Sequence, residues 1–344
     1  MNINFLLGPK NLGILGCRSR TGFPSIIMFR YSANLVCTLF FILVLIEITC
    51  SLLLVSLSAE SCVEKVEMTK KALVVGGTSG IGRGMAEFLA KQGTSVCIAG
   101  RNADAGAKIV KELELLTPAG SQAKHSYASV DGFNLTSVKA LADQQKELDY
   151  LVLTQGMATL QSFTPTVDGV DQKLSLHFYS RVLLMQLLAP TLQKSSEGGK
   201  VISVLSAGVH GAYTGYEKDP TLEKSYGIKN AADAAGLYND VALHKMSQEY
   251  PSITWTHAAP GFVATNIGKE MPWLVRMLVR GLMVFGKSHS ACGETLGSAW
   301  LKQGPGFHLM SPTGGDASRT SIHDDVMKSG FWASTQKILQ KFLA

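Results

Sequence analysis

The feature that most constrains this chain is a glycine-rich turn between a predicted strand and a predicted helix. The stretch VGGTSGIGRG, residues 75–84, follows the apolar run KKALVV and precedes MAEFLAKQG, where apolar residues recur at helical spacing. The first turn of a helix leaves backbone N–H groups without intrahelical partners, and the helix dipole places positive charge there. The arrangement therefore indicates an anion seat, and the pyrophosphate of a dinucleotide is the expected ligand.

Strand-like and helix-like segments alternate from Lys70 onward. The strand-like runs include TSVCIAGR, HSYASVD, YLVLTQG, GGKVISVLSAG and SITWTHAAPG, and VDQKLSLHFYSRVLLMQLLAPTL is expected to form one long amphipathic helix. Such alternation predicts an α/β fold, a single doubly wound parallel sheet of the Rossmann type with ligands at the carboxyl ends of the strands. We expect one domain over residues 69–312 and a C-terminal extension over 313–344.

The N-terminal segment differs in composition from the rest. Residues 1–32 hold basic but no acidic residues, and residues 33–59 are apolar with Glu47 as the one charged side chain. Residues 60–68 are interpreted as a linker. Three interpretations are open: a membrane anchor, a cleaved targeting peptide, or a gene-model extension upstream of a native start at Met68. The first predicts membrane association in the endoplasmic reticulum or another organelle, and the last a cytoplasmic protein.

Charge and cysteine content argue against several classes of function. The net charge is +6 and the basic residues are scattered without interleaved aromatics, so no nucleic-acid partner is expected. Beyond the N-terminal segment only Cys97 and Cys292 occur, without metal-type spacing, so neither a disulfide framework nor a metal site is expected. The sequon beginning at Asn134 would carry a glycan if the domain were lumenal.

From about Thr69 to Gln303 the chain resembles the short-chain dehydrogenase/reductase family. The glycine spacing is the wider one of that family, although Val75 replaces its usual Thr. The fourth-strand NNAG of relatives is reduced to LTQG, which keeps Gly156. The resemblance implies a homo-oligomer, since relatives are commonly dimers or tetramers. The cofactor-binding residues that it implies in these two motifs are Gly76, Thr78, Ser79, Gly80, Ile81, Gly82 and Gly156.

Residues after the second strand bear on the choice of cofactor. Arg101 and Asn102 stand where an acidic residue would bind the adenosine ribose, and Arg101 offers its guanidinium to a 2′-phosphate instead. NADP(H) is therefore expected rather than NAD(H). The resemblance further implies an adenine contact by Asp131, or by Asn134 a turn later. The remaining cofactor contacts that it implies, on the nicotinamide side, are Lys229, Pro260, Gly261 and Thr265.

The catalytic residues of the family match this chain only in part. Ser206, at the end of VISVLSAG, matches the Ser that positions the substrate oxygen. Lys229 matches the Lys that binds the nicotinamide ribose and lowers the pKa of a catalytic Tyr. The family places that Tyr four residues earlier, where this chain has Ser225, whereas Tyr226 lies three residues earlier.

Alternatives remain open for the proton chemistry. Three alternatives concern the proton donor. It is Tyr226, or it is Tyr213 or Tyr216 in the preceding insertion, or the chain has no competent acid. His177 stands at the position of a relay Asn in the family. It either relays protons near neutral pH or packs within its apolar helix.

A lid-like segment follows the sixth strand, at about residues 264–290. The segment is apolar with interspersed basic residues. Three placements are open for its large apolar side chains: they line a substrate pocket, lie on a membrane surface or pack against the core. These side chains are Trp273, Leu274, Met277 and Met283.

We therefore predict an NADP(H)-dependent oxidoreductase that reduces or oxidises a small lipophilic carbonyl or alcohol by hydride transfer. The alternative is a catalytically impaired NADP(H)-binding sensor or scaffold protein.

Overall fold

The computed structural model describes residues 38, 41–49, 69–264 and 286–343. The chain divides into two compact units, Met1–Glu67 and Met68–Ala344, and each is considered by itself. In the first unit residues 41–49 are helical, and most of the apolar stretch 33–59 lies outside the described residues. Within the described part of the chain, none of the helices combines the length and the hydropathy needed to cross a membrane.

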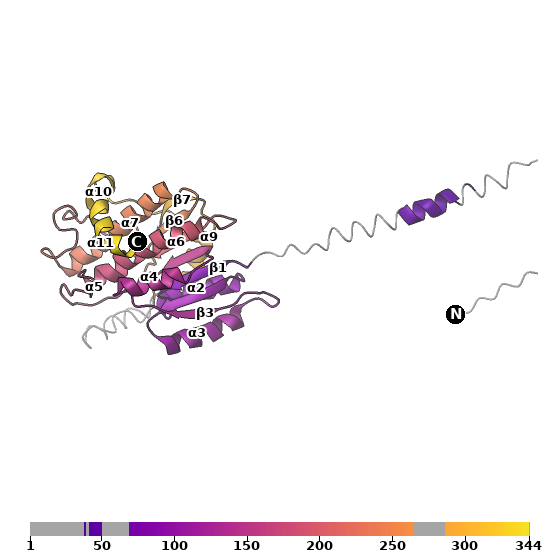
Figure 1. Cartoon of the computed structure of the whole chain (residues 1–344), viewed down its shortest axis with the longest axis horizontal. Coiled ribbons are helices and arrows are strands. Elements are labelled where there is room, and N and C mark those ends of the chain that lie inside the picture. The colour runs from indigo at the N-terminus through magenta and orange to yellow at the C-terminus, as the bar shows by residue number, and fades with distance from the viewer. Residues whose placement is uncertain (1–37, 39–40, 50–68, 265–285, 344) are drawn as a thin grey trace, which may run out of the picture. The chain divides into compact units, whose positions relative to one another are not determined.

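The second unit is built on one seven-stranded sheet in the order β3-β2-β1-β4-β5-β6-β7 (Figure 1). All adjacent strands are parallel. The strands are β1 (Lys71–Val75), β2 (Ser95–Gly100), β3 (Ser126–Ser129), β4 (Tyr150–Leu153), β5 (Lys200–Val204), β6 (Thr254–Ala258) and β7 (Gly306–Met310). The strand order reverses between β1 and β4, which confirms the predicted doubly wound fold of the Rossmann type.

Helices cover both faces of this sheet. They are α2 (Gly80–Lys91), α3 (Ala103–Leu116), α4 (Leu135–Asp143), α5 (Gln172–Leu174), α6 (Ser180–Leu192), α7 (Ile228–Glu249), α9 (His289–Leu301), α10 (His323–Lys328) and α11 (Phe331–Leu343). One hydrophobic core contains side chains of α4, α6, α7 and α11, and the other those of α2, α3 and α9. Successive residues of β1 alternate between the two cores, because a strand covered on both faces buries every side chain.

The C-terminal extension completes the first of these cores. Val326 of α10 and Phe331 and Leu339 of α11 are buried in it. The Phe331 ring stacks on Tyr238 of α7, with ring centroids 4.0 Å apart. Residues after 312 therefore contribute to the stability of the sheet domain.

The segment predicted as one long amphipathic helix, residues 170–192, is neither continuous nor amphipathic. A π-helical turn, η1 (Ser175–Tyr179), separates α5 from α6, and the Ser180 N–H donates to the Ser175 carbonyl. Helix α6 buries most of its residues, including consecutive ones such as Val182 to Met185. The prediction was wrong here because α6 lies between the sheet and other helices, so its apolar residues need not form one stripe.

Candidate functional site

The glycine turn lies between β1 and α2 and is pressed against the end of β4. Gly76 adopts a positive φ of 83°, which favours glycine. A Cβ on Gly82 would lie 2.4 Å from the Gly76 carbonyl oxygen and 2.4 Å from Thr154 Oγ1. Ser79 at the N-cap of α2 makes no side-chain capping bond. The first turn of α2 is thus left available to an external anion.

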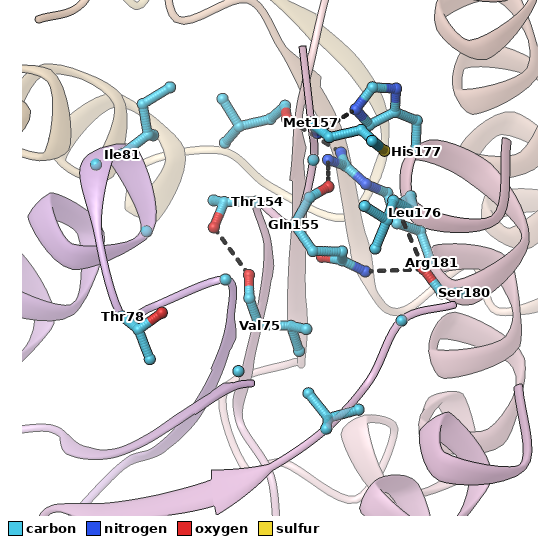
Figure 2. A pocket seen from close by; sticks show the side chains of 18 of the residues that line it. Val75, Thr78, Ile81, Thr154, Gln155, Met157, Leu176, His177, Ser180 and Arg181 are labelled. Carbon is cyan, nitrogen blue, oxygen red and sulfur yellow. Dashed lines mark hydrogen bonds between the residues drawn. The ribbon is translucent and has the colours of Figure 1, made fainter. Parts of the chain in front are cut away.

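A cavity of about 420 Å³ opens at the carboxyl ends of β1, β4 and β5, in the size range of ligand pockets. Figure 2 shows Thr78 of the glycine turn on one side, Arg181 of α6 on the other, and Thr154 after β4 between them. The predicted cofactor residues that line this cavity are Gly76, Thr78, Ser79, Gly80, Ile81, Gly82, Arg101, Gly156 and Pro260. Segments far apart in the sequence therefore form one nucleotide-sized cavity.

The other predicted cofactor residues lie elsewhere. The Asn102 side chain accepts from Ala105 N and caps α3, and Asp131 Oδ1 accepts from the backbone N–H two residues later. Gly261, with φ +70°, follows Pro260 but does not line the cavity. Thr265 lies outside the described residues, as do the lid residues Trp273, Leu274, Met277 and Met283.

Arg181 forms much of the inner wall of the cavity. Its side chain is almost fully buried, and it donates to Gln155 O at 2.6 Å, Val204 O at 3.0 Å and Ser203 Oγ at 2.8 Å. Burial lowers the pKa of Arg181 to about 9. The guanidinium therefore bridges the carboxyl ends of β4 and β5 and fixes their spacing beside the cavity. Sequence analysis did not identify this residue, although a single Arg within the apolar run YSRVLLM was a usable signal.

Two roles were open to His177 on sequence grounds, and the structure places it in the π-helical turn at the cavity. Its Nε2 accepts the Met157 N–H at 3.0 Å, so this nitrogen carries no proton. Burial, with the nearby charges of Arg181 and Lys173, lowers the pKa of His177 to about 3. A neutral, buried ring that supports the backbone after β4 fits the packing role and not a proton relay near neutral pH.

Ser206 follows β5, as predicted, but a helix backbone faces it. Its Oγ is buried and has no hydrogen-bond partner in the part of the chain that the structure describes. A Cβ on Gly236 of α7 would lie 2.5 Å from this oxygen. Gly236 is seven residues beyond Lys229, which corresponds to about two helical turns. Ser206 therefore meets α7 about two turns beyond Lys229, on the same side of the helix, and not at the turn that the Tyr-x-x-x-Lys spacing suggested.

Tyr226 lies in an apolar environment. Its ring packs edge-on against Phe163, with centroids 5.9 Å apart, and Lys173 Nζ lies 5.6 Å from the ring centroid. The hydroxyl is buried without a hydrogen-bond partner among the described residues. Burial and the charge of Asp171 raise the pKa of Tyr226 to about 12, opposite to the direction that an acid–base catalyst near neutral pH requires.

Lys229 points to solvent from the first turn of α7. Its side chain is 83% exposed and pairs with Asp233 one turn later. The Tyr213 hydroxyl, an alternative acid, donates to Asp219 O at 2.9 Å and contacts Ser225 Oγ at the same distance. Among the described residues no hydrogen bond joins Ser206, Tyr226 and Lys229, so the structure does not show the hydrogen-bonded catalytic arrangement that the resemblance implied.

A buried histidine–aspartate cluster lies behind Ser206. Asp240 Oδ1 accepts from His257 Nδ1 at 2.5 Å and Oδ2 from His210 Nε2 at 2.9 Å. Because His257 Nε2 accepts the Ser206 backbone N–H at 3.1 Å, its proton is on Nδ1. His210 faces an acceptor with each nitrogen, the second being the carbonyl of Gly211, and this arrangement favours its protonated form.

The pKa directions agree with these proton positions. Burial alone would lower the pKa of His210, but its hydrogen bond and charge interaction with Asp240 raise it. Burial lowers the pKa of His257, and the carboxylate offsets this only in part. The three donor atoms lie within 4.8 Å of one another, which is close enough to hold a metal ion. In this structure the three side chains form a buried hydrogen-bonded network.

The sequence of this chain is similar to those of known oxidoreductases. The model of the short chain dehydrogenase family matches residues 70–218. An oxidoreductase of Emericella nidulans is 32% identical over 202 residues, which cover 57% of this chain and 59% of that protein. A polyprenol dehydrogenase of Mus musculus is 28% identical over 225 residues, which cover 62% of this chain and 66% of that protein. The chain thus spans less than two thirds of the length of both relatives.

A solved structure shares the architecture. A short-chain dehydrogenase from Sphingobium yanoikuyae, in complex with NADPH, has a TM-score of 0.52 and 14% identity, covering 80% of this chain and 95% of that one. At this identity the likeness is one of fold. A doubly wound fold with this sheet order places its ligand site at the carboxyl ends of the strands, and the cavity described above lies there.

Proposed function

The chain belongs to the short-chain dehydrogenase/reductase family, and on that premise we propose that it is an oxidoreductase that binds NADP(H). The reaction would be hydride transfer between this cofactor and a lipophilic carbonyl or alcohol. The observation that carries the proposal is the single cavity formed by the glycine turn, Arg101, the end of β4 and Pro260. A cavity of about 420 Å³ with an uncapped helix start at one wall fits a dinucleotide.

Arg101 supports NADP(H) over NAD(H). It lines the cavity directly after β2, where the adenosine ribose of a dinucleotide lies in doubly wound folds. A carboxylate at this point would repel a 2′-phosphate, whereas a guanidinium binds one through charge-assisted hydrogen bonds.

Two observations support a lipophilic substrate. The wall of the cavity opposite the glycine turn carries apolar side chains, among them Met157, Leu176, Leu184 and Leu205. The relative from Mus musculus is named for a dehydrogenase of polyprenol, a lipophilic alcohol. We propose that the substrate of this chain also belongs to the class of lipophilic alcohols or carbonyls, without assigning polyprenol itself.

The roles of the residues follow from their positions. The glycine turn and the start of α2 would bind the pyrophosphate, Arg101 the 2′-phosphate, and Arg181 would keep the strand ends at fixed spacing. When bound, NADPH supplies the hydride. The Ser206 hydroxyl has no hydrogen-bond partner among the described residues, and the substrate oxygen would provide one.

A second candidate function, NADP(H) binding without turnover, is favoured by the contact between Ser206 and Gly236. Carbonyl reduction requires a proton donor beside the forming alkoxide. In the part of the chain that the structure describes, no phenol hydroxyl bonds to Ser206 Oγ, and residues 265–285 contain no tyrosine. A sensor or scaffold would bind the cofactor in the cavity and would need no proton donor beside Ser206.

Two measurements on the full-length chain test the proposal. NADPH binding is followed by cofactor fluorescence, and turnover is then measured as NADPH consumption across a panel of lipophilic aldehydes and ketones. Binding with turnover that Ser206→Ala abolishes supports the oxidoreductase. Tight binding without turnover on any substrate selects the sensor or scaffold. Absence of association at millimolar NADPH and NADH overturns both.

A further inference from the structure

We propose that Phe133 strengthens the preference of this chain for NADP(H) over NAD(H) by holding the Arg101 guanidinium against its ring. The inference rests on the proposed function, because it concerns how the same cavity selects its cofactor. Its parts are an arginine on the loop after β2, an aromatic ring on the loop after β3, and a carboxylate that fixes the second loop. None of these contacts is apparent from the glycine motif.

The first step is the position of the guanidinium. Arg101 lines the cavity, and its Cζ lies 5.2 Å from the centroid of the Phe133 ring, within the range of a cation–π contact. The described residues contain no ion pair between Arg101 and a carboxylate. The neighbouring Asn102 side chain is occupied by the N-cap of α3, so it does not hold the guanidinium either. The ring is the contact that orients Arg101.

The second step is the charge that this contact leaves available. A carboxylate partner would neutralise the guanidinium and would repel an incoming phosphate dianion. An aromatic face restricts the side chain without adding negative charge, and it leaves the N–H donors of the fork free at the ring edge. Arg101 is thus positioned in advance while keeping its full positive charge for a 2′-phosphate.

The third step is the fixation of the loop that carries the ring. Asp131 Oδ1 accepts the Phe133 N–H at 3.1 Å, and the Asp131 N–H donates to Ser137 Oγ at 3.1 Å. The next residue, Asn134, caps α4 through its side chain. The loop between β3 and α4 is therefore held at both ends, and the carboxylate of Asp131 is directed at this loop. Asp131 acts as a positioning residue for Phe133 in this arrangement.

The test measures dissociation constants of the full-length chain for NADPH and NADH by cofactor fluorescence. Phe133→Leu keeps the apolar volume and removes the aromatic face, and Phe133→Tyr is the matched control that keeps it. We expect Phe133→Leu to weaken NADPH binding about two- to five-fold and to change NADH binding less than about two-fold. Phe133→Tyr should leave both constants close to those of the wild type.

A double-mutant cycle isolates the route through Arg101. Arg101→Gln should weaken NADPH binding about ten-fold or more, since it removes charge-assisted hydrogen bonds to the phosphate. In that background Phe133→Leu should have no further effect on NADPH, because the ring has no guanidinium left to orient. Thermal unfolding of each variant shows whether the domain remains folded.

Three outcomes decide the matter. A loss specific to NADPH that disappears in the Arg101→Gln background supports the proposal. Equal weakening of NADPH and NADH by Phe133→Leu overturns it, since the ring would then contact a part common to both cofactors. An undiminished effect in the Arg101→Gln background also overturns it. A wild type that binds neither cofactor is a different result, because it removes the proposed function as a whole.

Discussion

Gly236 of α7 faces Ser206, the serine that follows β5, with no side chain between them. A Cβ at position 236 would lie 2.5 Å from Ser206 Oγ and 2.5 Å from Cβ and Cγ of His210. The His210 ring is fixed by its bond to Asp240 of the same helix, 2.9 Å long. The helix, the strand end and the following turn therefore meet in contact at Ser206, the residue that the sequence resemblance assigns to the substrate oxygen.

The closeness of this contact predicts the effect of Gly236→Ala. The added methyl group must displace Ser206 or the fixed His210 ring, and we expect the free energy of unfolding to fall by about 1–2 kcal/mol. This is a net loss, since alanine in a helix interior contributes about 1 kcal/mol in the opposite direction. Urea denaturation measures the difference. Gly330→Ala is the control, because no heavy atom lies within 4 Å of its Cβ position. A Gly236→Ala protein as stable as the wild type would show that the contact between α7 and Ser206 can accommodate a methyl group.

The glycine turn predicts a binding defect for Gly82→Ala. Its Cβ would lie 2.4 Å from the backbone oxygen of Gly76, and a backbone atom cannot turn away as a flexible side chain can. The turn must open, so we expect NADPH affinity to fall about ten-fold or more. A fluorescence titration measures this, with Gly304→Ala, where no heavy atom is near the Cβ position, as control. Wild-type affinity in Gly82→Ala would mean that the phosphates do not approach this turn.

Lys229→Ala tests the residue that the family pattern selected. Because the side chain is 83% exposed and its ion pair with Asp233 is at the surface, we expect NADPH affinity to change less than about two-fold. The same variant should unfold within about 1 kcal/mol of the wild type. Titration with NADPH and urea denaturation provide both values. A ten-fold loss of NADPH affinity would instead place Lys229 at the nicotinamide ribose, as its sequence context suggested.

A histidine pair, His244 half-buried and His323 buried, predicts that acid destabilises the domain. His244 Nδ1 lies 2.9 Å from His323 Nε2, and His244 stacks on Phe307. Burial and the charge of His323 lower the pKa of His244 to about 4, and burial lowers that of His323 as well. The unfolded chain, with histidine pKa values of about 6.5, then binds more protons than the folded one. The free energy of unfolding should therefore fall as the pH drops from about 6.5 to about 4.

His210 contributes with the opposite sign. Its folded pKa is raised, so the stability that it supplies is present at low pH and is lost as the pH rises through the folded value. Urea denaturation between about pH 7.5 and pH 4.5 measures the sum. His244→Gln keeps a polar side chain and removes the titration, so its stability should fall less steeply on acidification. An equal slope in wild type and variant would contradict the assignment to His244.

The sequence by itself determined the fold and the position of the main cavity at the glycine turn. The alternation of apolar strands and helices requires a parallel sheet covered on both faces, and the spacing of Gly76, Gly80 and Gly82 requires a close approach of backbone after β1. These are local properties: the period of apolar residues and the conformations open to glycine do not depend on distant parts of the chain. Arg101 and Pro260, which lie within two residues of strand ends, line the cavity, as their positions in the sequence led us to expect.

Only the tertiary structure decided which residues stand beside Ser206 and Arg101. Lys229 was selected by its neighbours in sequence, yet the path of residues 207–227 sets where α7 begins relative to β5. Seven residues make about two helical turns, so Ser206 meets the same side of α7 farther along the helix, at Gly236 and not at Lys229. Phe133 meets Arg101 because two loops from separate strands converge. Contacts of this kind depend on the summed geometry of many elements, and no local pattern encodes them.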